Sequence, residues 1–486
     1  MHEKSAHELN ELFTSGKISA REIVQSALDA IDERNNELNA FLSVFADRAL
    51  ERADQLDTKR SKGQSLGKLA GVPIALKDNM HVKGEVTTCA SEILESYRAP
   101  FDATITRLFE QEDALLIGKT NMDEFAMGGS GTHSAYGLTR NPWNLNCNPG
   151  GSSSGSAAAV SGRLCPIAMG SDTGGSIRQP AAYTGVTGFK PTYGRVSRYG
   201  LVAFGSSLDQ IGPITQDVSD AALVMEVIGR HCSKDSTSID NEPYAYRETL
   251  QKPVKGMKIG VPWSFLKQIS GESKSNFEAS IKVLKDLGAE VVDVDLSSLR
   301  YGIAIYYILA TAEASTNLAR FDGIRYGHRT TKAANLDEIY ERSREEGFGW
   351  EVKNRILLGT YILSATSHEA YYTKAQRVRM VIIRELNEAF KHCDLIVHPV
   401  APGPAPALDA IKDPIDEYLQ DLYTVGANLA GCPGLSVPSG FTSTGMPLGI
   451  QFLGPQRHDA KVLQMGHAYQ KATDHLKVPK GFGGKA

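Results

Sequence analysis

The sequence predicts an α/β fold built around one large mixed β-sheet with helices on both faces. Segments of strand and helix character alternate along the whole chain, and no internal repeat is present. A strand–helix–strand pattern stands near the middle, and two strands joined by a short Gly-containing turn stand near the end. Alternation of this kind is typical of α/β folds, whereas runs of strands followed by runs of helices are not.

The N-terminal region is predicted to be helical. Ser19 and Glu22 are three residues apart, which is the spacing of a capping box at the start of a helix. The residues that follow place an apolar stripe at helical spacing: Ile23, Val24, Ala27, Leu28 and Ile31. We therefore expect an amphipathic helix that packs on a core.

Two short apolar segments in the first third of the chain are predicted to be strands. Residues 71–79, "GVPIALKDN", end at Lys77 and Asp78, and residues 114–121 read "ALLIGKTN". Neighbouring side chains of a strand point to opposite faces of the sheet. Lys77 and Asp78 are therefore expected to face different sides.

The second half of the chain continues the alternation. Residues 256–262 and 289–296 flank a helical segment at a spacing that fits a βαβ unit. A helical region rich in Tyr and Arg follows at 301–391, and then a strand at 393–400 leads into a Pro-rich surface loop at 401–408. Two paired strands, 434–441 and 447–455, and a last helix, 458–473, complete the chain.

The length would allow about three average domains, but the continuous alternation of strands and helices favours one large globular unit. The chain has 486 residues, of which 41% are hydrophobic and 22% charged, so it can bury a large core. We predict a single domain, 1–486. Its regions are N-terminal helices (1–60), a Gly- and Ser-rich region (61–215), a βαβ and helical region (216–395), and C-terminal strands with a helix (396–486).

The charge and the cysteines exclude several classes of protein. The net charge of −4 lacks the basic footprint that a chain binding nucleic acid unaided needs, so any RNA is expected on another chain. The six cysteines are scattered without a C-x-x-C pair, which predicts reduced core thiols and no metal site. The N-terminus is unlike a signal peptide, and no apolar run is long enough to span a membrane. We expect a soluble cytoplasmic protein.

The stretch "GGSSSGS" at residues 150–156 invites two interpretations. It contains the pattern G-x-S-x-G with Ser153 at its centre, which is the nucleophile elbow of α/β-hydrolases. That reading needs a downstream histidine, and the candidates are His231, His328, His368, His398 and His458. A phosphate-binding P-loop is excluded, because the Gly-Lys-Thr at 118–120 is preceded by Asp113 where the motif requires glycine.

A second Gly-rich loop changes this balance. Residues 170–197 contain Thr173, Gly174, Gly175 and Ser176 in a predicted tight turn. Consecutive glycines let backbone N–H groups converge on one point. That is the geometry of an oxyanion hole beside a nucleophilic hydroxyl.

With the lysine that ends a predicted strand, these two loops resemble the amidase signature family. That family combines a lysine, a serine in a Gly-Gly-Ser-Ser loop and a nucleophilic serine in a Gly-Gly-Ser-Ile-Arg loop, which correspond here to Lys77, Ser152 and Ser176. The resemblance covers nearly the whole chain and is densest over 71–215. It implies a nucleophilic Ser176, with Ser152 as a relay to the base Lys77 and a cis peptide before Ser152. Backbone N–H groups of Thr173, Gly174, Gly175 and Ser176 would form the oxyanion hole, and Ser153 would be loop structure only.

Several stretches, among them "NMDEFAMGGS" and "FDGIRYG", resemble the members of this family that serve as glutaminase subunits of tRNA-dependent amidotransferases. This resemblance implies glutamine as substrate, with Arg355 binding its carboxylate, Asp421 its ammonium group and Tyr306 lining the pocket. It implies no cofactor in this chain, two partner subunits (called B and C), and tRNA, ATP and Mg²⁺ bound mainly by a partner. A stand-alone amidase or esterase acting on a small amide, and a catalytically idle scaffold, are the alternatives.

One position departs from the family pattern. Ser154 stands where most members have glycine. A serine would cost on the order of 1 kcal/mol there if the backbone had a positive φ. Asp172 and Arg178, which flank the Gly-Gly-Ser-Ile loop, are expected to brace it.

Overall fold

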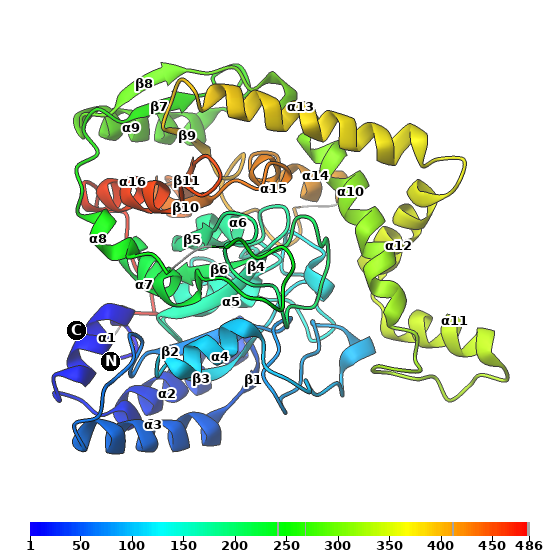
Figure 1. Ribbon diagram of the computed structural model, residues 1–486, viewed down its shortest axis with the longest axis horizontal. Helices are drawn as coiled ribbons and strands as arrows, with labels where there is room; N and C mark the ends of the chain where they lie inside the picture. Colours follow the sequence, from blue (N-terminus) through cyan, green and yellow to red (C-terminus); the bar gives the residue numbers. More distant parts are fainter. Residues whose placement is uncertain (241–242, 268, 411–412, 484–486) are drawn as a thin grey trace.

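A mixed sheet of eleven strands runs through the part of the chain that the computed structural model describes, residues 1–240, 243–267, 269–410 and 413–483 (Figure 1). The strand order is β1-β3-β2-β4-β6-β5-β10-β11-β9-β7-β8. The bounds are β1 Phe41–Val44, β2 Pro73–Lys77, β3 Leu115–Thr120, β4 Ile167–Asp172, β5 Thr187–Lys190, β6 Gln210–Thr215, β7 Lys258–Val261, β8 Glu290–Asp293, β9 Leu395–Pro399, β10 Gly434–Phe441 and β11 Pro447–Leu453.

The sheet contains both parallel and antiparallel neighbours. β2 is parallel to β3 and to β4, and β7 is parallel to β8 and to β9. The other neighbouring strands are antiparallel, including the hairpin of β10 and β11. The predicted α/β class with one large mixed sheet is confirmed, and so are the βαβ unit and the C-terminal pair of strands.

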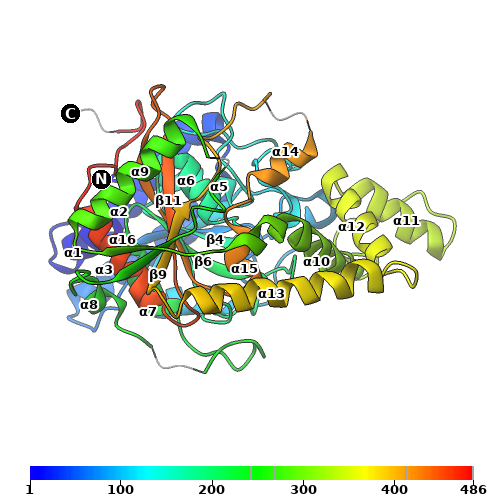
Figure 2. The ribbon, with the colours of Figure 1, turned by 90° about the horizontal axis from the view of Figure 1, so that it is seen from above.

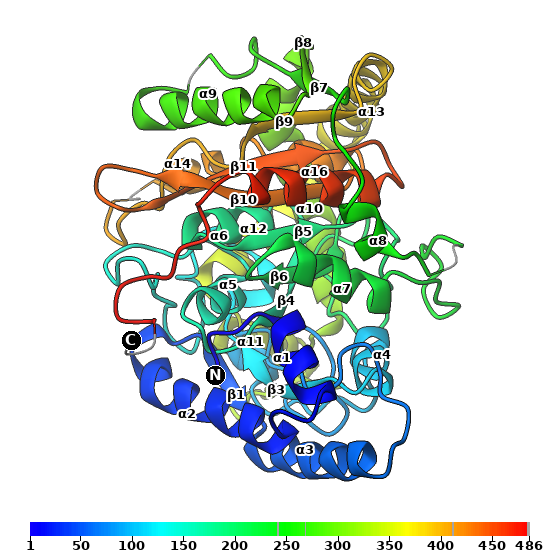
Figure 3. The ribbon, with the colours of Figure 1, turned by 90° about the vertical axis from the view of Figure 1, so that its left-hand side faces the viewer.

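Helices cover both faces of this sheet. Figures 2 and 3 show α5, α6 and α9 on one side and α7, α13 and α16 on the other. The α-helices are α1 Ala6–Thr14, α2 Ala20–Leu38, α3 Ala46–Ser61, α4 Thr104–Gln111, α5 Ser154–Ser161, α6 Arg178–Thr184, α7 Val218–Ile228, α8 Tyr246–Leu250, α9 Gly271–Asp286, α10 Gly302–Asn317, α11 Leu336–Gly347, α12 Trp350–Leu363, α13 Lys374–Ala389, α14 Pro414–Leu419, α15 Val425–Leu429 and α16 Asp459–Lys471. In Figure 1, α10 to α13 form an arm at one side of the molecule.

The first predicted helix has the expected start. Ser19 is the N-cap of α2, and its hydroxyl accepts from the backbone N–H of Glu22. The Glu22 carboxylate accepts in return from the Ser19 N–H, so the capping box is complete. The six cysteines are buried and free, as their spacing predicts. Over the described residues, no helix is long and apolar enough to cross a membrane.

The alternation of side chains along β2 sends Lys77 to one particular face. Ile74 and Leu76 belong to one hydrophobic cluster, whereas Ala75 belongs to another that also contains the apolar residues of α5. Lys77 shares the face of Ala75 because side chains two apart in a strand point the same way. The lysine therefore points toward the start of α5, and Asp78 points away from it, as predicted.

The three parallel strands β2, β4 and β3 end at one edge of the sheet. Lys77 is the last residue of β2, Thr120 the last of β3 and Asp172 the last of β4. In open α/β sheets, ligands bind at the carboxyl ends of the strands. The loop after β4 and the loop before α5 both reach this edge, so the fold brings the sequence-predicted site together.

The second glycine of the G-x-S-x-G pattern serves helix packing. A Cβ at Gly155 would lie 2.4 Å from the Ala40 carbonyl oxygen and 2.5 Å from the Asn121 backbone nitrogen. Gly155→Ala is therefore expected to lower the free energy of unfolding by about 1–3 kcal/mol through overpacking. Thermal unfolding followed by circular dichroism measures this, with Gly403→Ala as control because a Cβ there meets nothing within 4 Å. Equal stability of the two variants would contradict the packing role.

Candidate active site

Lys77 is fully buried and donates hydrogen bonds to two serines. Its ammonium nitrogen lies 2.7 Å from the Ser152 hydroxyl and 3.0 Å from the Ser153 hydroxyl. A third, longer bond of 3.3 Å reaches the Ser171 carbonyl oxygen in β4. Every acceptor is uncharged, so the lysine is surrounded by dipoles and not by a paired carboxylate.

Burial lowers the pKa of Lys77 to about 7, from an ordinary value of 10.5. The charges of Asp123, Asp172 and Asp209 act in the opposite direction, but they do not offset the loss of hydration. Near neutral pH a large fraction of this lysine is therefore the free amine. A free amine can accept a proton, which an ordinary surface lysine cannot do at that pH.

The loop before α5 presents Ser152 to the lysine through a cis peptide bond between Gly151 and Ser152. The Gln179 side-chain oxygen accepts from the Gly151 N–H at 3.0 Å, and the Asp123 N–H donates to the Ser152 carbonyl at 3.1 Å. The family resemblance predicted this cis peptide, and the structure contains it. The loop is thus held from both sides by residues outside it.

Two expectations about the other serines of this loop are corrected. The interpretation of Ser153 as loop structure alone is wrong, because its hydroxyl shares Lys77 with Ser152. Ser154 begins α5 and is not among the residues with a positive φ, so the strain considered for a serine there does not arise. Its hydroxyl instead lies 3.2 Å from the Thr139 hydroxyl.

The loop after β4 places Ser176 beside the loop before α5, which carries the predicted relay Ser152 and is called the relay loop below. The Ser176 carbonyl accepts from the Ser153 N–H at 3.2 Å, and the serine is 7% exposed. No described residue hydrogen-bonds to the Ser176 hydroxyl, which is therefore free to meet a substrate. The hydroxyls of Ser152 and Ser176 are not bonded to each other here, and catalytic hydrogen bonds often form only when substrate is bound.

The backbone of this loop is shaped like a site for an anion. Among the described residues, none accepts a hydrogen bond from the N–H groups of Gly174, Gly175 or Ser176. The Thr173 hydroxyl donates to Asp209 at 2.6 Å, and the Thr424 hydroxyl donates to the Gly174 carbonyl at 2.6 Å. The Thr173 side chain and the Gly174 carbonyl therefore fix the loop, while the N–H groups named above stay available for a ligand.

Asp172 and Arg178 brace the loop, as expected. Both side chains are fully buried, and two bonds of 3.0 Å join the guanidinium to the carboxylate. The Arg178 charge and its hydrogen bonds outweigh the effect of burial, so the pKa of Asp172 lies below its ordinary value. Asp172 also accepts from the Ile177 N–H at 3.2 Å, which closes the loop around Ser176.

Tyr306 of α10 lies against the same loop. A Cβ at Gly174 would come within 2.5 Å of its ring, so only glycine allows this approach. Tyr306 is buried, and burial holds the pKa of its hydroxyl far above the ordinary value. The structure thus brings Tyr306 to the predicted oxyanion loop.

Arg355 and Asp421 are both buried, and neither is a solvent-exposed surface residue. The guanidinium of Arg355 lies 5.1 Å from the ring of Tyr307, and its Nε donates to Glu351 at 2.7 Å. One carboxyl oxygen of Asp421 is buried without a hydrogen-bond partner among the described residues. A Cβ at Gly175 would lie 3.1 Å from that oxygen, so it faces the Ser176 loop.

The pKa of the Asp421 carboxyl group follows from this environment. Burial and the nearby charge of Asp172 raise its pKa well above the ordinary value, and Arg355 acts against them. A buried carboxyl oxygen without a partner costs free energy unless a ligand supplies a donor. A bound ammonium group would provide that donor.

The alternative based on a histidine finds no support in the arrangement. In the described part of the chain, no histidine hydrogen-bonds to Ser152, Ser153 or Ser176. His398 is buried, and its Nδ1 lies 3.0 Å from the Pro399 carbonyl oxygen. Burial lowers the pKa of His398 to about 4. The arrangement of the described residues therefore does not support the nucleophile-elbow interpretation of Ser153.

Sequence reasoning missed five polar residues that support the site, four through their side chains and Ser171 through its backbone carbonyl. They are Ser171, Gln179, Asp209, Glu351 and Thr424. Gln179 directly follows the second Gly-rich motif and could have been considered for that reason. Asp209, Glu351 and Thr424 stand in segments without any local signal.

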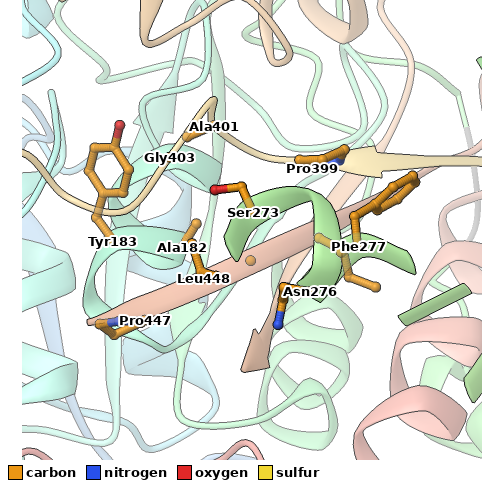
Figure 4. A pocket seen from close by; sticks show the side chains of 12 residues that line it. Ala182, Tyr183, Ser273, Asn276, Phe277, Pro399, Ala401, Gly403, Pro447 and Leu448 are labelled. Atoms are coloured by element: carbon orange, nitrogen blue, oxygen red, sulfur yellow. The ribbon is translucent and has the colours of Figure 1, made fainter. Parts of the chain in front are cut away.

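A separate crevice lies between α6, α9 and β11. Figure 4 shows Tyr183, Asn276 and Phe277 along it, and none of the predicted catalytic residues lines it. It has about 10 Å³ of room for water-sized molecules, which is about the space of one water. It is too small for an amide substrate.

Comparison with known proteins agrees with the geometry. The family model described as Amidase matches residues 22–463. The A subunit of glutamyl-tRNA(Gln) amidotransferase from Protochlamydia amoebophila is 57% identical over 481 residues, which cover 99% of this chain and 98% of the relative. The protein of the same name from Chlamydia felis is 52% identical over 482 residues, 99% of this chain and 98% of the relative.

Solved structures agree with the sequence relatives. The A subunit of glutamyl-tRNA(Gln) amidotransferase from Thermotoga maritima has a TM-score of 0.82 at 39% identity and covers 98% of this chain and 97% of its own. A bacterial aryl acylamidase has a TM-score of 0.87 at 28% identity and covers 99% of both chains. The chain belongs to the amidase signature family. Within it, the chain is similar over nearly its whole length to the A subunit of glutamyl-tRNA(Gln) amidotransferase.

The burial of Lys77 predicts a pH-dependent cost to stability. The unfolded chain keeps the lysine proton up to about pH 10.5, whereas the folded chain loses it near pH 7, so folding below pH 10.5 has to release this proton. The cost of releasing it shrinks as pH rises from 7 toward 10.5, and the folded state becomes more stable over that range. Between pH 6 and 9 the wild type should therefore gain about 3 kcal/mol relative to Lys77→Met. Chemical denaturation at several pH values measures this gain.

Lys17→Met, at an exposed position, is the matched control and should show no such trend. A constant difference between Lys77→Met and wild type over this pH range would show that Lys77 is not a neutral amine in the folded protein.

Proposed function

We propose that this chain is the glutaminase subunit of a tRNA-dependent amidotransferase. It hydrolyses glutamine through an acyl-serine intermediate and supplies the ammonia to a partner subunit. The observation that carries the catalytic part is the buried Lys77, with its pKa lowered to about 7, bonded to Ser152 next to Ser176. The relatives at 50–57% identity are named as subunits of an amidotransferase, which supports a glutaminase subunit over a stand-alone amidase.

The proposed reaction uses Lys77 as base, Ser152 as relay and Ser176 as nucleophile. Ser176 attacks the side-chain amide carbon and gives its proton to Ser152, which gives its own proton to the Lys77 amine. A hydroxyl can do this because it donates one hydrogen bond while it accepts another. The proton returns by the same route to the amide nitrogen, ammonia leaves, and water then attacks acyl-Ser176 to release glutamate.

The free N–H groups of the Ser176 loop stabilise the oxyanion in this scheme. Gly174, Gly175 and Ser176 contribute their backbone donors, with Thr173 at the start of the loop. Removing one donor of this kind typically costs about 10²–10³-fold in rate. The bond of Thr173 to Asp209 keeps the loop in place before any charge develops.

Recognition of glutamine falls to three buried side chains. Arg355 would bind the α-carboxylate, because a planar guanidinium matches a carboxylate with two bonds. Asp421 would accept from the α-ammonium group through its unpartnered oxygen. Tyr306 would line the pocket between them and the Ser176 loop.

The partners follow from the name of the relatives, which is that of one component of a larger enzyme. We propose a complex with B and C subunits, in which the B subunit contacts the tRNA and binds ATP and Mg²⁺. The acceptor is Glu-tRNA(Gln), and Asp-tRNA(Asn) is a second candidate. The net charge of −4 fits a chain that leaves tRNA to another subunit, and the whole acts as a carbon–nitrogen ligase with glutamine as amido donor.

A stand-alone amidase is the second candidate, because the aryl acylamidase has the same fold at a TM-score of 0.87. Ammonia release from glutamine and from simple aryl amides, with and without the B and C subunits, separates the two. A stand-alone amidase would hydrolyse simple amides unaided, whereas the glutaminase subunit would prefer glutamine and respond to its partners.

The three serines near the lysine should contribute unequally. Ser176→Ala and Ser152→Ala are expected to reduce glutamine-dependent ammonia release by at least about 10³-fold, since the reacting group or its relay is lost. Ser153→Ala should cost about tenfold, because Lys77 loses one hydrogen bond and keeps the Ser152 bond. The reverse ranking, with Ser153→Ala inactive and Ser176→Ala active, would refute this assignment.

The base should also be visible in the pH profile. The kcat/KM for glutamine is expected to rise with pH through a midpoint near 7 and then level off, since the working lysine is the neutral amine. Lys77→Arg keeps the positive charge but cannot lose its proton, so it should be inactive at every pH. An active Lys77→Arg variant would show that the base lies elsewhere.

A further inference from the structure

A short turn connects the relay loop with the helix that carries Arg355. It consists of Asp123 and the single helical turn Glu124–Ala126. Phe125 and Ala126 have φ values of 49° and 62°, in the left-handed region that side chains other than glycine rarely adopt. Such residues each cost about 1–3 kcal/mol and cluster at functional sites, so this turn is held in place by its surroundings.

Asp123 fixes the first end of the turn to the catalytic loop. Its N–H donates to the Ser152 carbonyl at 3.1 Å, and its carboxylate accepts from the N–H groups of Gly131 and His133, each at 3.1 Å. A Cβ at Gly151 would lie only 2.0 Å from the Asp123 carboxylate. The carboxylate therefore packs directly on the peptide that precedes Ser152.

Glu124 fixes the second end to α12. Its carboxylate accepts from the Gly349 N–H at 2.9 and 3.1 Å and from the Ser91 hydroxyl. Gly349 is the N-cap of α12 and has no side chain to cap the helix itself. Glu124 thus supplies from a distant part of the chain an acceptor and a negative charge, both of which helix N-termini favour.

The geometry of α12 makes this attachment important for the pocket. Arg355 stands on the buried face of the helix and is held by Glu351, which also accepts from the Tyr418 hydroxyl at 3.2 Å. The opposite face is open, with Trp350 67% and Leu357 68% exposed. Figures 1 and 2 show α12 in the arm at the side of the molecule, away from the main body of the sheet.

We infer that Glu124 is a positioning residue that sets Arg355 at a fixed distance from Ser152 and Ser176 by anchoring the N-terminus of α12. The inference rests on the proposed binding of the glutamine carboxylate by Arg355. Consecutive residues of one rigid turn hold the two parts of the site. Loss of the Glu124 contact to Gly349 would let α12 shift and move Arg355 away from the substrate carboxylate, which weakens binding. Lys77, Ser152 and Ser176 do not lie on α12, so the residues that carry the chemical step keep their positions.

Loss of the anchor should weaken glutamine binding more than chemistry. Glu124→Ala is expected to raise KM for glutamine about tenfold with kcat changed less than about threefold. Glu124→Gln retains a side-chain oxygen for the Gly349 N–H and should keep KM within about twofold to threefold of wild type. Burial raises the pKa of Glu124 to about 7, so assays at pH 8.5 keep the wild-type carboxylate ionised.

A double-mutant cycle distinguishes positioning from a general structural role. If Glu124 acts through Arg355, the pair Glu124→Ala/Arg355→Ala should have the KM of Arg355→Ala alone. Glu92→Ala removes a neighbouring exposed carboxylate as the matched control and should leave KM unchanged. Ser91→Ala, which removes one bond to Glu124, should raise KM about threefold and replaces Glu124→Ala if that variant does not fold.

The outcomes separate the inference from the proposed function. Kinetics are measured on the full chain, alone and co-expressed with its B and C subunits, with thermal unfolding as a check on folding. If Arg355→Ala leaves KM for glutamine unchanged, the proposed recognition of glutamine is wrong. If Arg355→Ala raises KM, three results would overturn the positioning role alone. Glu124→Ala could leave KM unchanged, it could lower kcat instead, or its effect on KM could multiply with that of Arg355→Ala in the double variant.

Discussion

The site depends on one constraint, which is that Lys77 is buried without a carboxylate partner. A lysine in such surroundings loses its proton near neutral pH, because the cost of removing an ammonium group from water exceeds what neutral dipoles return. Ser152, Ser153 and the Ser171 carbonyl provide those dipoles. If Asp78 faced the same side of the strand, its carboxylate would stabilise the charged form of Lys77. Strand alternation instead directs the Asp78 carboxylate to the Lys119 ammonium group, at 2.8 Å.

The sheet explains how residues far apart in sequence reach this lysine. β2 lies between β3 and β4 and is parallel to both, so the three strands deliver their following loops to one edge. The buried pair of Asp172 and Arg178 then fixes the Ser176 loop, and Asp123 fixes the Ser152 loop. Breaking a buried ion pair by removing one partner typically costs about 3–5 kcal/mol, so the loop is tied to the stability of the core.

The sequence was sufficient to predict the α/β class and most strands, because hydrophobic periodicity is a local signal. The grouping of Lys77, Ser152 and Ser176 was predicted from the resemblance of two Gly-rich motifs and a lysine to the amidase signature family. Strand order could not be predicted, since nothing local states that β3 lies between β1 and β2. The contact of Ser153 with Lys77 was missed because three successive serines look alike until the backbone directs each hydroxyl. Arg355 and Asp421 were found by family resemblance only, and the anchoring role of Glu124 depends on a contact across 225 residues.

The most direct test of the lysine–serine–serine mechanism is the pKa of Lys77 itself. The chain is labelled at the lysine side-chain carbons next to the amino group, and the Lys77 signal is assigned in nuclear magnetic resonance spectra by its loss in Lys77→Arg. We predict that this one signal titrates with a midpoint near 7. A midpoint near 10.5, the ordinary value for lysine, would contradict a neutral base and with it the proposed mechanism.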